Sequence, residues 1–400
     1  MSHGDSHDVI VVGAGASGLA AATALYAAGL DTVCLEARDR IGGRLLSAPT
    51  SYPDLALDLG ATWFWDGEEQ VRQLAARSGI ETFEQHLAGD TVLHETTGTH
   101  RLAGNRIDVP SRRFAAGAQS LAAALAAALP DGRLRLNTPV SAIHPHRRGG
   151  LVLDTPAGTL HAEHVVLALP PALSLESIEF GDSLPDDLRS LAGTTPVWMG
   201  AVAKVVAQYP SAFWREAGLA GAALSRTGPL QEIHDMSGPG GSPAALFGFA
   251  HARAVGPGFE KAVTAQLAQC FGPAAATPDA LYVQNWSAER WTAPSTVQHL
   301  ADYSLFGHPL YRQPALDGRL HWASTETATA HAGHIEGALA SAERAARAVL
   351  AAATGDANAS GADAGVATAD RWTLDLSGLE SAQFKAGRLA DVRAESIRKP

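Results

Sequence analysis

Cysteine, lysine and long apolar runs are all scarce in this chain of 400 residues. The two cysteines, Cys34 and Cys270, cannot form the disulfide framework of a small secreted protein. No apolar stretch approaches the roughly 20 residues that a membrane-spanning helix needs. The N-terminal residues are polar and lack the apolar core of a signal peptide. These absences predict a soluble, cytoplasmic protein that does not bind a membrane.

Positive charge is also limited, with 30 Lys and Arg residues against 41 Asp and Glu residues and a formal net charge of −11. Such a chain is not expected to bind nucleic acid. Its histidines suggest no metal site, because the spacing of those on or beside predicted strands matches no ligand template; these are His144, His146, His161 and His164. A hydrophobic content of 46% is nevertheless enough for one large domain or two closely packed domains.

The most informative stretch begins at Asp8. A run of β-branched residues to Val12 predicts a buried parallel strand. It leads into a Gly-x-Gly-x-x-Gly turn at residues 13–18, an alanine-rich helix and a second strand that ends at Glu36. The glycines permit a tight turn and close backbone approach to a pyrophosphate, which the helix N-terminus then faces. Glu36 is placed to accept hydrogen bonds from a ribose. The stretch predicts dinucleotide binding, and an ordinary βαβ turn is the alternative.

A second glycine pair, Gly42-Gly43, follows Glu36 and ends in Arg44, whose guanidinium suits bidentate phosphate binding. A single N-terminal Gly-x-Gly-x-x-Gly followed by this segment resembles the FAD-binding segment of the flavin-dependent amine oxidase superfamily. That superfamily includes the monoamine and polyamine oxidases. The resemblance implies FAD as the cofactor, with Glu36 on the adenosine ribose and Arg44 along the pyrophosphate.

Four later segments are similar to further flavin-contacting segments of the superfamily. They are the glycine turn and aromatic cluster at 60–65, the return strand near Val140, the strand that ends in Asn285-Trp286, and the Thr-Glu-Thr turn before a helix near Ile335. The resemblance implies that Glu326 binds the ribityl chain and that the Ile335 N–H faces the flavin pyrimidine. The implied cofactor contacts are Gly13, Gly15, Ala16, Ser17, Gly18, Glu36, Ala37, Arg38, Gly42, Gly43, Arg44, Gly60, Ala61, Thr62, Val140, Trp286, Thr325, Glu326 and Ile335.

Lys204 is a catalytic candidate. It interrupts the apolar, strand-like run 197–208 in a chain with only four lysines. A buried lysine costs free energy unless it is paired or neutralised. The segment resembles the strand whose lysine holds a water against flavin N5. The alternative is a lysine that points outward from the sheet.

Three positions depart from the superfamily's pattern. Ser295 matches the cysteine that links FAD covalently in many monoamine oxidases, so the resemblance implies non-covalent FAD. Thr296 and His334 match the two tyrosines that cage the amine. Together with Trp63, they are the candidate substrate contacts. His334 is also the second catalytic candidate, as a base or a hydrogen-bond donor. His331 either lies on the same face as His334 or is a solvated residue.

The sequence predicts an α/β fold in which a Rossmann-like FAD-binding domain carries an inserted, shortened α+β substrate domain of the amine oxidase type. The FAD-binding domain comprises residues 1–78, 131–195 and 286–350, and the substrate-binding domain comprises 79–130 and 196–285. Residues 351–370, rich in Ala, Gly, Asp and Ser, predict a flexible linker before a C-terminal tail, 371–400.

The implied function is an oxidase that transfers hydride from an amine-bearing carbon to FAD, with an imine product and reduction of O₂ to H₂O₂. The partners are then a small amine and O₂, and the sequence does not decide whether the protein forms a homodimer. One alternative is a biosynthetic oxidase or desaturase for a larger or carrier-bound substrate. Another is a catalytically degraded flavoprotein that acts as a partner. An amino-acid oxidase would need an arginine for the carboxylate, and Arg215, Arg226 and Arg253 are candidates.

Overall fold

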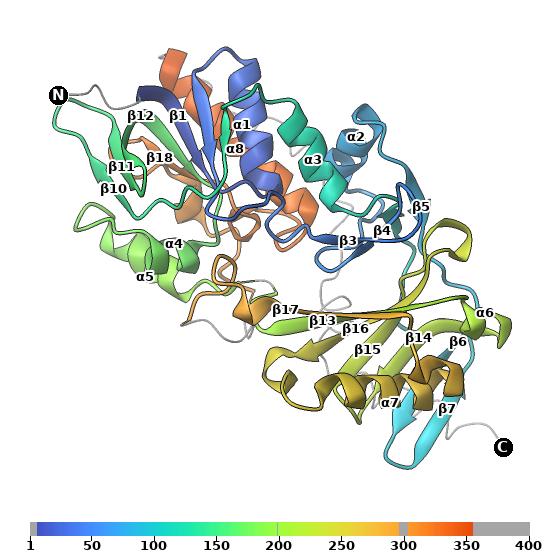
Figure 1. Ribbon diagram of the computed structural model, residues 1–400. Coiled ribbons are helices and arrows are strands. Elements are labelled where there is room, and N and C mark those ends of the chain that lie inside the picture. Colours follow the sequence, from blue (N-terminus) through green and yellow to red (C-terminus); the bar gives the residue numbers. More distant parts are fainter. Residues whose placement is uncertain (1–5, 198, 296–302, 355–400) are drawn as a thin grey trace.

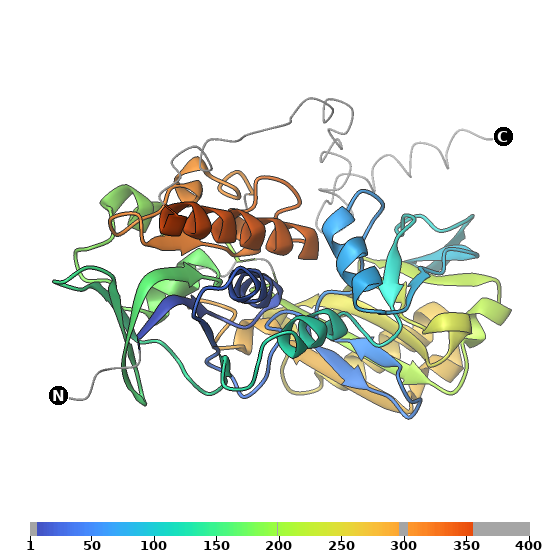
Figure 2. The same cartoon turned by 90° about the horizontal axis from the view of Figure 1, so that it is seen from above.

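The computed structural model describes residues 6–197, 199–295 and 303–354 (Figure 1). Two seven-stranded sheets dominate this part of the chain. Figures 1 and 2 show each sheet with its helices in its own half of the molecule. No described helix is both long and apolar enough to cross a bilayer. Residues 351–354 of the predicted linker belong to the helix Ile335–Thr354. The rest of the linker, the tail and Thr296 lie outside the described residues, and the predicted domain boundaries remain a prediction.

The first sheet has the strand order β10-β11-β12-β1-β2-β9, with β18 paired to β12. Its centre is parallel, because β1 pairs in parallel with both β2 and β12. Both faces of β1 are buried: Val9 and Val11 belong to one core cluster, and Ile10 and Val12 belong to another. This explains the unbroken apolar run. The strands are β1 Ser6–Val12, β2 Thr32–Leu35, β9 Leu134–Arg135, β10 Ala142–Pro145, β11 Leu151–Thr155, β12 Gly158–Leu167 and β18 Leu320–Trp322.

Helices cover both faces of this sheet. On one face, α1 (Ala16–Ala27) packs beside α8 (Ile335–Thr354), with α3 (Gln119–Ala127) and α2 (Glu69–Arg77) in the same core (Figure 2). Small buried side chains such as Ala21 and Ala22 let α1 lie close to its neighbours. The other core includes Leu188 and Leu191 of α5 (Asp186–Thr194), which packs beside α4 (Pro171–Ser177). The predicted unit of strand, glycine turn, helix and strand is confirmed.

The second sheet is mixed, with the order β17-β13-β16-β15-β14-β6-β7. Only β14 and β6 pair in parallel among its described neighbours. The strands β6 and β7 form an antiparallel hairpin, and α7 (Phe259–Phe271) covers one face of the sheet (Figure 1). The strands are β6 Asp90–Glu95, β7 Gly98–Leu102, β13 Val202–Tyr209, β14 Leu219–Ser225, β15 Leu230–Asp235, β16 Ala244–His251 and β17 Ala280–Asn285.

The predicted strand at 197–208 is partly wrong, because β13 begins only at Val202. Met199 has φ +70°, and the Gly200 N–H bonds to the Val197 carbonyl, so a turn precedes the strand. Two short antiparallel pairs complete the strands: β3 (Ser47–Pro49) with β4 (Ala56–Asp58), and β5 (Thr82–Glu84) with β8 (Arg112–Phe114). The short helix α6 spans Phe213–Glu216.

Candidate active site

A pocket lies over the turn between β1 and α1. Its walls bring together sequence segments from the glycine turn to the start of α8. Most of the predicted cofactor contacts line it: Gly13, Gly15, Ala16, Ser17, Glu36, Ala37, Arg38, Gly42, Gly43, Arg44, Ala61, Val140, Thr325 and Ile335. His334 lines it as well. The predicted contacts that are not among the lining residues are Gly18, Gly60, Thr62, Trp286 and Glu326.

The geometry of the turn requires glycine at two of its positions, Gly13 and Gly18. Gly13 has φ +103°, and a Cβ at Gly18 would lie 1.8 Å from the Gly13 carbonyl oxygen. The second glycine pair closes against this turn, since the Gly42 N–H donates to the Ala14 carbonyl at 2.8 Å. The N-terminus of α1 has no side-chain cap. Its free N–H groups and positive dipole end are therefore available to an anionic ligand.

Two buried hydroxyls in the pocket wall have no hydrogen-bond partner among the described residues. They are the Oγ atoms of Ser17 and Ser324. Buried polar atoms in proteins are almost always paired. A ligand that carries hydrogen-bonding groups would satisfy both. With the glycine turn and the acidic residue after β2, these orphan hydroxyls show that the residues fit a dinucleotide such as FAD.

Glu36 is buried at the end of β2, and its carboxylate is fixed by two backbone donors. It accepts from the Ala14 N–H at 2.7 Å and the Arg38 N–H at 2.9 Å. The Arg38 guanidinium reaches the loop after β17, where it bonds Glu289 at 3.2 Å and Thr292 at 2.8 Å. Sequence reasoning missed both partners, because they lie more than 250 residues away.

Arg44 and Glu326 form a bidentate ion pair, with Nη–Oε distances of 2.6 and 3.1 Å. Glu326 is fully buried in the short Thr325–Thr327 turn, so the guanidinium compensates its charge inside the protein. The pair joins the second glycine segment to the turn before α8. Its predicted contacts with the pyrophosphate and the ribityl chain stay predictions.

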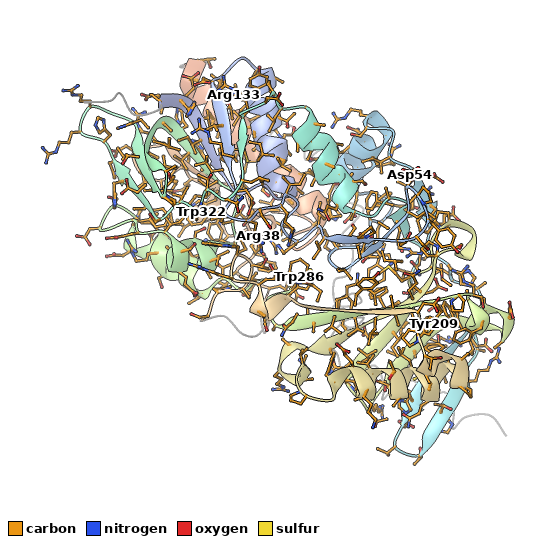
Figure 3. The ribbon with its side chains drawn as sticks, viewed as in Figure 1. Arg38, Asp54, Arg133, Tyr209, Trp286 and Trp322 are labelled. Atoms are coloured by element: carbon orange, nitrogen blue, oxygen red, sulfur yellow. The ribbon has the colours of Figure 1, made fainter. Side chains whose placement is uncertain are left out.

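Trp286 and Arg38 lie where the two halves of the molecule meet (Figure 3). Trp286 is fully buried, and its Nε1–H donates to the Leu59 carbonyl at 3.0 Å. This indole bond ties the end of β17 to the segment that leads into Gly60. The described contact of Trp286 is therefore structural support for the pocket wall.

Lys204 lies on β13 and is fully buried, so the interpretation as an outward-pointing lysine is wrong. Its Nζ donates to the Gly60 carbonyl at 2.9 Å and to the Thr62 hydroxyl. The ammonium also lies 4.3 Å from the centroid of the Phe247 ring. Lys204 thus bonds the residues on either side of Ala61, which lines the pocket.

Burial lowers the pKa of Lys204 to about 7, although the negative charge of Asp58 opposes this shift. Burial likewise raises the pKa of Asp58 to about 6, against the opposing charge of Lys204. Asp58 accepts hydrogen bonds from the Ser47 hydroxyl at 2.7 Å and the Ala118 N–H at 2.8 Å. Lys204 and Asp58 are thus a buried pair in which each charge favours the ionised form of the other.

His334 meets a carboxylate that the sequence analysis did not single out. Its Nδ1 lies 2.6 Å from Glu68 Oε1, and its ring centroid lies 5.0 Å from that of Trp65. His331 Nδ1 lies 3.6 Å from the same oxygen, so both rings share one partner. Burial favours a high pKa for Glu68, but hydrogen bonds from His331 and His334 outweigh it and lower that pKa.

Trp63 packs against the second sheet, with ring centroids 5.2 Å from both Phe247 and His234. Its indole N–H donates to Gln85 at 3.1 Å. Phe247 also contacts the Lys204 ammonium, so Trp63 and Lys204 share an aromatic wall. This arrangement is compatible with a substrate surface. Thr296, the third predicted substrate contact, lies outside the described residues.

Comparison with known proteins decides the family. A sequence profile described as "Flavin containing amine oxidoreductase" matches residues 16–116 and 108–350. The chain belongs to this family. It is therefore a flavin-dependent oxidoreductase of the amine oxidase type.

Individual relatives of this flavoenzyme are distant but matched over most of their length. Flavin-containing amine oxidase B of Homo sapiens is 26% identical and covers 86% of each chain. Putrescine oxidase of Kocuria rosea is 24% identical and covers 86% of this chain and 95% of its own. A solved structure of putrescine oxidase bound to putrescine, 23% identical, has a TM-score of 0.74 over 86% of this chain and 99% of its own, which shows the same fold.

Proposed function

We propose that the protein is an FAD-dependent amine oxidase that converts the amine-bearing carbon of a small amine to an imine, with O₂ reduced to H₂O₂. The observation that carries this proposal is Lys204, which is buried beneath a dinucleotide pocket and bonded to Gly60 and Thr62. A buried amine with a pKa near neutrality is costly to keep in a core, which argues for a functional role.

The cofactor in this proposal is FAD, held without a covalent bond. FAD, when bound, supplies the hydride acceptor and passes the electrons to O₂. Glu36 would hold the ribose, the N-terminus of α1 the phosphates, and the Ile335 N–H at the start of α8 the flavin ring. Ser295, at the position of the linking cysteine, bonds Glu176 through its N–H at 2.6 Å and its hydroxyl at 2.8 Å.

The chain's own residues would prepare the amine for oxidation. An amine must be neutral to release hydride, so a proton acceptor is needed near the pocket. Lys204 Nζ, whose pKa is lowered to about 7 by burial, would exchange a proton with a water at the wall formed by Gly60, Ala61 and Thr62. His334, fixed by Glu68, would orient the amine in place of an aromatic cage.

The substrate would be an amine without a carboxylate next to the nitrogen. Arg215 forms two 2.8 Å bonds to the buried Asp235, and Arg226 pairs with Glu95 at 3.0 Å. Arg253 lies on an exposed short helix, Ala252–Ala254. These three candidate arginines are thus engaged elsewhere or on the surface. Relatives named for putrescine and for amines make primary amines and diamines the first substrates to test.

The test is aerobic H₂O₂ release by the purified yellow protein with primary amines, diamines and amino acids, beside Lys204→Met. We expect turnover of one amine class and a drop of about 10²-fold in kcat/KM in the variant, in the range of acid–base contributions. Thermal unfolding checks that the variant folds, because methionine removes a buried charge but also removes the donor to the Gly60 carbonyl. If acid precipitation leaves the flavin on the protein, non-covalent binding is wrong. An unchanged rate in Lys204→Met would remove the lysine from the reaction.

A further inference from the structure

Three possible metal ligands meet at the edge of the flavin pocket. Glu68 comes from the loop before α2, and His331 and His334 come from the loop before α8. One ligand atom from each of them lies within 4.8 Å of the other two, and no other such group occurs in the part of the chain that the structure describes. From Glu68 Oε1, the two Nδ1 atoms are 2.6 and 3.6 Å away.

The carboxylate is held in place by a bond that leaves this oxygen available. Glu68 is only 2% exposed, and its Oε2 accepts from the Trp65 N–H at 3.1 Å. Such supporting hydrogen bonds orient the ligands of metal sites in proteins. The Oε1 atom points at the two imidazoles.

The histidine loop is equally fixed. The Thr325 hydroxyl accepts from the Gly333 N–H and donates to the His334 carbonyl, both at 2.8 Å. The His334 N–H closes back onto the His331 carbonyl at 3.0 Å, and His331 has φ +52°. None of these bonds uses a ring nitrogen, so the loop presents both imidazoles without occupying them.

The donor set selects a class of ion. Two neutral imidazoles and one carboxylate carry a net charge of −1, which favours a divalent cation. Nitrogen-rich sets prefer Zn²⁺, Cu²⁺ or Ni²⁺, whereas Mg²⁺ and Ca²⁺ require mostly oxygen ligands. Zinc–nitrogen and zinc–oxygen bonds are roughly 2.0–2.2 Å long. Transfer of the His334 proton from Nδ1 to Nε2 keeps that ring neutral.

We propose that Glu68, His331 and His334 bind a divalent transition-metal ion such as Zn²⁺, and that the bound ion inhibits amine oxidation. His334 lines the flavin pocket, so the ion occupies the side chain that would orient the amine. Its positive charge also repels an approaching ammonium. The inhibition rests on the proposed function, whereas the binding does not.

The binding test is calorimetric titration of the flavin-loaded protein with ZnCl₂, after EDTA treatment and removal of the chelator. We expect one ion per chain and at least a tenfold loss of affinity in both Glu68→Gln and His331→Ala. The control His100→Ala removes an exposed histidine elsewhere and should leave the affinity unchanged. Glutamine keeps an oxygen for the Trp65 N–H, and thermal unfolding checks both variants. Equal affinity in the wild type and in either folded ligand variant would overturn the site.

Inhibition is measured on the same samples with an amine that the wild type oxidises. We expect Zn²⁺ to inhibit with a midpoint that matches the calorimetric affinity, and Mg²⁺ to have no effect. In His331→Ala, Zn²⁺ should reduce the rate much less, when each rate is compared with that of the same variant without Zn²⁺. Zinc binding without inhibition would overturn the inhibitory role but not the binding site. Absence of turnover with any amine would count against the proposed function alone, because the calorimetry needs no substrate.

Discussion

Lys204 and Asp58 are two ionisable groups that the fold buries close together, and each shifts the other's pKa. The apolar run around Lys204 made it recognisable as unusual from sequence alone. Its partner was not recognisable, because Asp58 lies in a short strand whose pattern gives no sign of a distant lysine. Glu68 escaped notice for the same reason, since 266 residues separate it from His334. Residue types carry chemistry, but only the fold brings them together.

Replacing Asp58 with asparagine tests the electrostatic coupling. Asp58 favours the charged form of Lys204, while Arg113 and burial disfavour it. Removing the carboxylate therefore lowers the pKa of Lys204 below about 7. If neutral Lys204 is the active form, the limb of kcat/KM that rises with pH moves to lower pH in Asp58→Asn. Asparagine still accepts from the Ala118 N–H. A pH profile that does not move would show that this limb does not report Lys204.

Stability gives the same pair a second signature. The folded-state pKa of Lys204 is lowered, so between about pH 7 and its ordinary value the unfolded chain binds more protons and stability rises with pH. The raised pKa of Asp58 has the opposite effect. Between the ordinary pKa of aspartate and about pH 6, the folded chain binds more protons than the unfolded chain, so stability falls as the pH rises. Denaturant titrations of Lys204→Met should no longer show the rise in the free energy of unfolding above pH 7. If this rise is the same in the variant as in the wild type, it does not come from Lys204.

At the scale of elements, the glycine turn between β1 and α1 was predictable because it depends on local backbone geometry. The strand, turn, helix and second strand all follow within one short stretch of sequence. The start of β13 was not predictable from its apolar run, since the turn at Met199 depends on a backbone conformation that the composition does not reveal. Periodicity locates an element better than it locates its ends.

Gly18→Ala tests the packing of the turn. The added Cβ would meet the Gly13 carbonyl oxygen at 1.8 Å and the Ala168 Cβ at 3.0 Å, so backbone must move. We expect a loss of about 1–3 kcal/mol in the free energy of unfolding, as for overpacked cores, and a weakened flavin site. The control is Gly256→Ala, where nothing lies within 4 Å of the added Cβ. Denaturant titration and the ratio of visible to ultraviolet absorbance measure the two effects. Equal behaviour of both variants would contradict this description of the turn.

For the whole molecule, a few contacts between distant segments join the two halves. Lys204 of the second sheet bonds Gly60, and Arg38 beside the first sheet bonds Glu289 and Thr292. The family resemblance anticipated the two-part architecture and most of the pocket. It did not anticipate the Arg44–Glu326 ion pair, whose partners are 282 residues apart. Long-range pairs of this kind have no local sequence signal.

Because the pocket draws its walls from segments far apart in sequence, cofactor binding should stabilise the whole chain. At a free FAD concentration 100 times its Kd, the gain is about 2.7 kcal/mol. Thermal unfolding of the flavin-free protein should shift upward with FAD and much less with riboflavin, which lacks the adenosine that Glu36 would hold. A shift of equal size with NAD⁺ would contradict the assignment of the pocket to a flavin.

The central claim is that an amine reduces a flavin bound in this pocket. The most direct measurement is the visible spectrum of the flavin-loaded protein, mixed with each amine of the panel in the absence of O₂. The account predicts that one class of amine bleaches the flavin absorbance, that bleaching is slower in Lys204→Met, and that air restores the colour with release of H₂O₂. A flavin that stays oxidised with every amine, while dithionite still reduces it, would contradict the claim.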